Sequence, residues 1–167
     1  PGYRIGTGCA APGSSTPSTS SASLWLGQSG SRVDTNLRNG VPDDGTGRVL
    51  VALALGLANP IAPLPGNAGC TLFTSGEWWQ LLPGSTGTSG DHAASVTLPA
   101  LPPGYRVWLQ QASFAPASGA LALSDGNTLQ TPPVALPAPT VVRIANASDP
   151  SSATGTVSFS VPVVRFL

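Results

Sequence analysis

Side chains that could catalyse a reaction are few in this sequence. A serine nucleophile needs a histidine and an acid beside it, but His92, the only histidine, follows Asp91 in a Gly- and Ser-rich stretch that indicates a solvated loop pair. No Gly-x-Ser-x-Gly motif occurs. Glycoside hydrolysis needs two carboxyl groups, and Glu77, the only glutamate, has no second acid near it in the sequence. The sequence therefore indicates a protein that is not an enzyme.

Groups that could bind a metal are equally sparse. Asp43-Asp44-Gly45 offers carboxylate oxygens for calcium, but it lacks the spacing of a calcium-binding loop and follows a proline, as a tight turn does. Cys9 and Cys70 belong to no Cys-x-x-Cys pair, and a single histidine cannot complete a zinc site. We expect no metal and no other cofactor.

The two cysteines are expected to form a structural disulfide, Cys9–Cys70, in an oxidising compartment; the alternative is two buried thiols. The sequence begins at Pro1 without a methionine or a signal-like segment, which we interpret as a mature form whose export signal has been removed. No apolar run reaches the ~20 residues that span a bilayer. These features favour an exported protein, extracellular or at the cell surface.

The composition excludes one class of partner and favours another. Only 8% of the residues are charged, the formal net charge is zero and 41% are hydrophobic, whereas about 25% are charged in a typical soluble domain. The chain can therefore build a core, but it has no basic patch for nucleic acid. A weakly charged surface gives little repulsion between copies, which favours self-association.

Two adjacent tryptophans, Trp78 and Trp79, are candidates for a binding surface. Neighbouring residues of a strand point to opposite faces, so one of the two indoles should face away from the core. That indole would contact a polysaccharide or another protein, unless a loop of the same chain covers it.

A low-complexity stretch at 14–23 lies within an extended lead-in that spans 1–23. Its composition indicates a flexible or extended surface segment. Its hydroxyl groups are alternatively sites for O-linked sugars, and the candidates are Ser14, Ser15, Thr16, Ser18 and Thr19.

Strands must position these residues, because 20 glycines and 18 prolines forbid long helices. Alternating or continuous apolar runs predict strands at 24–28, 32–38, 48–57, 70–75, 77–82, 92–98, 105–114, 140–147 and 154–167. A short helix is the alternative at 48–57. Residues 120–129 indicate a hairpin that turns at Asp125-Gly126. Nine or ten strands predict one all-β domain over 1–167, a β-sandwich of jelly-roll or immunoglobulin-like type.

The last part of the sequence carries the clearest signal for assembly. A Pro-rich stretch at 131–139 indicates a semi-rigid arm, and 140–167 supplies two further strands. The apolar side chains expected to take part in assembly are Val157, Phe159, Val161, Val163, Phe166 and Leu167. This strand either completes its own sandwich or inserts into a neighbouring copy, and head-to-tail donation of that kind gives an open filament.

Several motifs follow one another over residues 6–130. They are Gly6-Thr7-Gly8-Cys9, Ala68-Gly69-Cys70-Thr71-Leu72, Leu109-Gln110-Gln111-Ala112 and Leu123-Ser124-Asp125-Gly126-Asn127-Thr128-Leu129. Their order resembles a secreted Gly/Pro-rich two-cysteine β module found in exported proteins of planctomycetes and similar bacteria. The resemblance supports the Cys9–Cys70 pairing and carries over no active site, since that module has no established function. Residues 131–167 depart from its pattern.

The sequence thus predicts a non-enzymatic structural subunit of an extracellular filament or cell-surface layer, with copies of itself as its main partner. The alternative from a different class is a secreted carbohydrate-binding or adhesion module that uses an exposed tryptophan. A capsid-like shell protein is a further alternative, because it shares the sandwich fold and the self-association.

Overall fold

The computed structural model describes residues 3–27, 30–45, 47–67 and 69–133, together with the strands at 141–145 and 156–160. Sheet A has the strand order β1-β10-β9-β4-β7, with β1 Tyr3–Ile5, β10 Ala120–Gln130, β9 Arg106–Ala115, β4 Leu50–Gly56 and β7 Trp78–Leu82. Sheet B has the order β12-β11-β2-β3-β8, with β12 Thr156–Ser160, β11 Val141–Ala145, β2 Thr19–Leu26, β3 Ser31–Arg38 and β8 His92–Leu98. A hairpin of β5 (Ala62–Pro63) and β6 (Thr71–Leu72) completes the described strands. The predicted all-β fold is confirmed, with twelve strands in the described residues rather than nine or ten.

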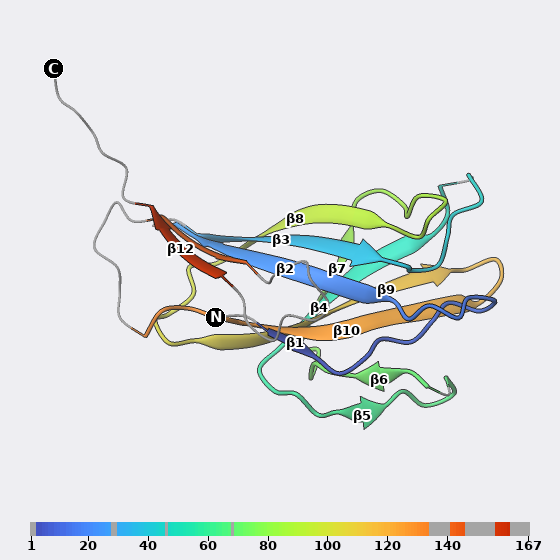
Figure 1. The fold of residues 1–167 in the computed structure, drawn as a ribbon, viewed down its shortest axis with the longest axis horizontal. Coiled ribbons are helices and arrows are strands. Elements are labelled where there is room, and N and C mark those ends of the chain that lie inside the picture. The colour runs from blue at the N-terminus through green and yellow to red at the C-terminus, as the bar shows by residue number, and fades with distance from the viewer. Residues whose placement is uncertain are drawn as a thin grey trace, which may run out of the picture.

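Sheets A and B face each other as the two layers of a β-sandwich (Figure 1), and their inner faces share one hydrophobic core. In β3, Val33 and Leu37 point inward, as the alternating sequence predicts. From sheet A, β4 adds Val51, Leu53 and Leu55. Fully burying each such side chain contributes about 1.5–3 kcal/mol. β4 pairs with β9 on one side and β7 on the other, so the alternative of a helix at 48–57 is wrong.

The outer faces of the two sheets differ in chemistry. On sheet B the outer face is polar: Asp34 accepts hydrogen bonds from Arg32 at 2.9 Å and from Ser95 at 2.6 Å. On sheet A the outer face is apolar over β4 and β7, whereas on β9 and β10 it also carries Arg106, which donates a hydrogen bond to Gln130 at 3.0 Å. The β5–β6 hairpin lies against it (Figure 1) and covers the part formed by β9 and β10.

A covering segment, which we call the flap (residues 61–75), is fixed to sheet A by polar and apolar contacts. Gln110 of β9 accepts a hydrogen bond from the backbone N–H of Phe73 at 3.1 Å and donates to the carbonyl of Thr71 at 2.8 Å. Phe73 lies against Gly126 of β10, where any Cβ would come within 2.5 Å of the Phe73 Cβ. Only glycine fits beneath this ring, so the flap and β10 are shaped for each other.

The Cys9–Cys70 disulfide is formed, so the predicted pairing is confirmed and the alternative of two buried thiols is wrong. Cys70 belongs to the flap. Cys9 lies beside β10, where its backbone N–H donates to the carbonyl of Leu123 at 2.8 Å. The disulfide therefore ties the flap to the segment that follows β1.

Residues 120–129 do not form the predicted hairpin. They belong to one 11-residue strand, β10, which pairs with β9 along most of its length. The register shifts so that Ser124 and Asp125 together stand opposite the single residue Gln111. This is a β-bulge, in which one strand carries an extra residue. The Asp125-Gly126 pair marks the bulge rather than a turn, because the residues on both sides of it continue the same pairing.

Two further sequence expectations change. β2 begins at Thr19, so the second half of the low-complexity stretch at 14–23 is a strand, with Ser20 and Ala22 buried inside the sandwich. His92 is not a solvated loop residue. It is 7% exposed at the start of β8, with its Nε2 2.9 Å from the carbonyl oxygen of Pro83.

Candidate interaction site along strand β7

Strand β7 forms one edge of sheet A, and its side chains alternate between the two faces of that sheet. Trp78 stands opposite Leu55 of β4, which belongs to the core, so Trp78 lies on the inner side of the sheet. Trp79 stands opposite Ala54 and is therefore the tryptophan that points away from the core. Both indoles are partly exposed, Trp78 at 39% and Trp79 at 53%.

Four large apolar side chains lie together on the outer face of sheet A, beyond the area that the flap covers. We call them the outer patch: Leu50, Trp79, Leu81 and Phe114, which are between 38% and 65% exposed. Leu50 and Phe114 are direct cross-strand partners, and Leu81 and Trp79 occupy alternate positions of β7. Apolar side chains that gather in this way on an exposed face mark an interaction surface.

On the inner side of β7, an apolar cleft of about 440 Å³ opens where β4, β7 and β8 end. We call it the end cleft. Trp78, Leu57 and Tyr105 are exposed members of its lining, and Leu101 adds to the apolar wall. Glu77 is the only charged residue that lines it. The end cleft and the outer patch therefore lie on opposite faces of the same edge strand.

The carboxylate of Glu77 is held in place beside this cleft. Its Oε2 accepts hydrogen bonds from the Ser75 hydroxyl at 2.7 Å and from the backbone N–H of Leu57 at 3.0 Å. The hydrogen bond from Ser75, followed by the backbone hydrogen bonds, lowers the pKa of Glu77 below its ordinary value. The cleft therefore carries one fixed negative charge at neutral pH.

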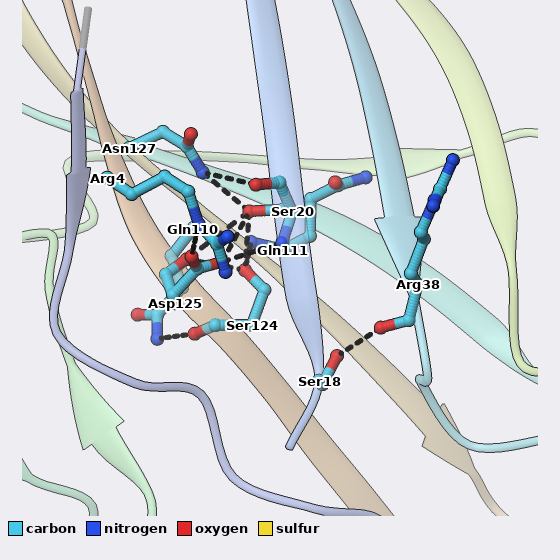
Figure 2. Close-up of polar contacts among 9 residues, drawn as sticks. All are labelled: Arg4, Ser18, Ser20, Arg38, Gln110, Gln111, Ser124, Asp125 and Asn127. Atoms are coloured by element: carbon cyan, nitrogen blue, oxygen red, sulfur yellow. Dashed lines mark hydrogen bonds and ion pairs between the residues drawn. The ribbon is translucent and has the colours of Figure 1, made fainter. Parts of the chain in front are cut away.

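A buried polar cluster joins the two sheets at the bulge of β10 (Figure 2). The carboxylate of Asp125, which has no exposed surface, accepts hydrogen bonds from Arg4 Nε of β1 and from the backbone N–H of Ser20 of β2, the latter at 2.6 Å. Asn127 Nδ2 donates to the hydroxyl of Ser20 at 2.6 Å. Burial raises the pKa of Asp125, although the hydrogen bonds from Ser20 and Arg4 act in the opposite direction. The cluster fastens β1, β2 and β10 together and presents no reactive group to solvent.

The acid and base residues noted in the sequence are not brought together. Glu77 lies at the end cleft beside Leu98, whereas His92 is at the other end of β8. Asp43 accepts hydrogen bonds from the N–H groups of its own loop, including that of Gly45 at 2.8 Å, as a turn residue does. Among the residues that the structure describes, no three His, Cys, Asp or Glu side chains gather where they could hold a metal.

The hydroxyl candidates for glycosylation divide into two groups. Ser14, Ser15 and Thr16 are exposed. Ser18 is fully buried and its hydroxyl donates to the carbonyl of Arg38 at 3.2 Å, so a sugar could not be attached there in the folded chain. Thr19 is the first residue of β2 and is half-buried.

The residues expected to take part in assembly also fall into two groups. Val157 and Phe159 belong to β12, where they pair with Ile144 and Val142 of β11 in the same chain, so they complete the chain's own sheet. Four candidates lie outside the described residues, namely Val161, Val163, Phe166 and Leu167, as does most of the predicted arm at 131–139.

Comparison of the chain with protein-family models, with curated proteins and with solved structures gives no match in any of the three. The resemblance of residues 6–130 to a secreted planctomycete module therefore stays an expectation. No helix in the described part of the chain is long and apolar enough to cross a membrane.

Proposed function

We propose that this chain is a non-enzymatic structural subunit that assembles with copies of itself into an extracellular filament or a cell-surface layer. One observation carries the proposal: β7 is an edge strand with large, exposed apolar side chains on both of its faces. Natural edge strands are protected by charges, prolines, bulges or covering segments, because an unprotected edge pairs with other chains. Between Trp78 and Leu82, β7 has neither a charge nor a proline.

The size of the outer patch indicates how much of the association it could supply. Its four side chains are about half exposed on average, and complete burial of such a side chain contributes about 1.5–3 kcal/mol. Covering the patch would therefore contribute about 3–6 kcal/mol. Association itself costs about 4–15 kcal/mol, so a stable contact also needs the hydrogen bonds of the β7 edge or the end cleft.

The location outside the cell is supported by the disulfide. Disulfides persist in oxidising compartments and are rare in the cytosol of most organisms. Cys9–Cys70 is buried and joins two segments of the folded chain, as structural disulfides do.

The test is self-association of the oxidised chain, measured by sedimentation velocity over a range of concentrations. Leu81→Lys should abolish assembly while leaving the circular dichroism spectrum unchanged, because it places a charge on the outer patch at an exposed position. Ala93→Lys is the matched control, since Ala93 is an exposed, outward-facing residue of β8, the edge strand of sheet B. A wild-type chain that stays monomeric at every concentration, or equal loss in both variants, would contradict the proposal.

A second candidate function rests on Trp79 alone. Its indole is 53% exposed on a sheet face, which is the arrangement that stacks against sugar rings as well as against proteins. If the chain is a polysaccharide-binding module, Trp79→Ala should remove binding in a pull-down with insoluble polysaccharides, while Leu81→Lys should affect binding less.

Electron micrographs of the wild-type material would separate filaments and layers from the closed shells of a capsid-like protein.

A further inference from the structure

We propose that the end cleft and the free edge of β7 receive residues 161–167 of a second copy of the chain, with Arg165 beside Glu77. This inference rests on the proposed function and deepens it by naming both partners of the contact.

The end cleft requires an occupant that is mostly apolar and carries one positive charge. Its exposed lining includes Trp78, Leu57 and Tyr105, and its single charge is the carboxylate of Glu77. The exposed Glu77 Oε2 atom accepts hydrogen bonds from Ser75 and from the backbone N–H of Leu57, so that charge is oriented at the cleft before a partner arrives. A preorganised charge of this kind sets the register of a partner and excludes anionic ones.

Residues 161–167, with the sequence Val-Pro-Val-Val-Arg-Phe-Leu, have this chemistry. Six of the seven side chains are apolar, and Arg165 is the only charged one. Pro162 has no N–H and is tolerated in a strand that pairs along one side only, which is the position of a strand added to a sheet edge. Charge complementarity and apolar character therefore both match the cleft.

The distance across the sandwich assigns the segment to a second copy. β12 lies at one edge of sheet B and β8 at the other, and β8 lines the end cleft beside β7. Four strand spacings of about 4.8 Å separate β12 from β8, which is about 19 Å. Seven extended residues span about 24 Å. Pairing with the five residues of β7 uses about 17 Å of that length, which leaves too little for the crossing of about 19 Å. One copy cannot cross its own sandwich and also pair along its own β7.

Charge reversal in the full-length chain tests the contact. Glu77→Arg alone and Arg165→Glu alone should each raise the concentration needed for half-maximal assembly at least about tenfold at low salt, because each places like charges together. An equimolar mixture of the two single variants should restore assembly, since each chain's cleft then meets a segment of opposite charge on the other chain. The double variant should assemble alone.

The outcomes separate the possible failures. If wild-type chains assemble and Leu81→Lys prevents it, but neither charge reversal has an effect, the inference is wrong while the proposed function stands. If the double variant assembles and the mixture does not, the segment occupies the cleft of its own chain and the second copy is excluded. Glu77→Gln, which keeps an oxygen acceptor for Ser75 and Leu57, should weaken assembly less than the reversal. An effect as large as that of Glu77→Arg would mean that the loop, rather than the charge, was disturbed.

Discussion

At the scale of single residues, Asp125 links three strands of the two sheets through one side chain. Its buried carboxylate accepts hydrogen bonds from Arg4 in β1 and Ser20 in β2, so one side chain of sheet A holds both a neighbouring strand and the facing sheet. Removing one member of a buried ion pair leaves the other charge without compensation, which costs about 3–5 kcal/mol. The pair therefore matters more through the penalty of breaking it than through its attraction.

Arg4→Met should lower the free energy of unfolding by about 3 kcal/mol at pH 7. Arg106→Met is the control, because Arg106 is exposed and its hydrogen bond is to Gln130. Urea denaturation followed by tryptophan fluorescence measures both. A loss at Arg4 no larger than at Arg106 would mean that Asp125 is stabilised without its ion pair.

The same variant has a pH dependence whose sign follows from the pKa of Asp125. Burial raises that pKa above its ordinary value of about 3.9. The contribution of this carboxyl group to stability is therefore complete below its ordinary pKa and is lost as the pH rises through the raised one. Arg4 acts to lower the pKa of Asp125. Removing Arg4 therefore raises that pKa further, and the loss of stability continues to a higher pH. The difference in free energy of unfolding between wild type and Arg4→Met should therefore shrink as the pH falls towards 3.

At the scale of elements, the flap covers the part of the outer face of sheet A formed by β9 and β10, and the disulfide secures it. The Cys9–Cys70 link closes a loop of 61 residues. In the chain-entropy model such a loop is worth about 4 kcal/mol of stability. Replacing both cysteines in Cys9→Ala/Cys70→Ala should cost about that amount in urea denaturation.

The same double variant should also make the flap the first site of proteolysis. Without the disulfide, the flap keeps its hydrogen bonds to Gln110, the one from Thr74 to the carbonyl of Trp108 at 3.1 Å and its apolar packing, but it loses its covalent link to Cys9. Mass spectrometry of early fragments identifies the cleavage point. First cleavage outside 61–75 would show that the disulfide secures another part of the fold.

The strands could be predicted from the sequence wherever apolar and polar residues alternate and no other local structure fits the same residues. β3, β7, β8 and β9 appear within a residue or two of their predicted bounds. β10 could not be predicted, because Asp125-Gly126 suits a hairpin turn and a bulge equally, and only pairing with β9 on both sides of the pair selects the bulge. Only the last residues of β2 were predicted, by the apolar run at 24–28, because the serines of its first half have a low propensity for a buried strand. In the structure Ser20 is satisfied by a partner from the facing sheet.

The candidate site could be predicted only in part. Adjacent tryptophans in a strand indicate that one faces outward, and that one is Trp79. Leu81 of the outer patch belongs to the same strand, but Leu50 and Phe114 come from β4 and β9, and only the strand order places them beside β7. The end cleft depends equally on topology, because Tyr105 and Glu77 are far apart in the sequence and both line it.

At the scale of the whole molecule, the sandwich has one polar outer face and one outer face that is apolar over β4 and β7; the flap covers part of the latter sheet. The apolar side continues round the edge strand β7 into the end cleft, whereas the polar side ends at β8. In the proposed assembly, a chain with this asymmetry would present its polar face to solvent and the edge at β7 to its neighbours. Contacts between unlike surfaces form a closed ring only if the rotation between successive copies adds up to a full turn. Otherwise they give open assemblies such as filaments and layers.

Hydrogen–deuterium exchange of the wild-type chain, compared between dilute and concentrated solutions, tests this assignment most directly. We expect the backbone amides of Trp78–Leu82 to exchange more slowly in concentrated solution, because a second copy then covers the edge of β7. The amides of β8, at the corresponding edge of sheet B, should exchange at the same rate in both. Unchanged exchange in β7 while the chain assembles would contradict the account, since the contact would then lie elsewhere.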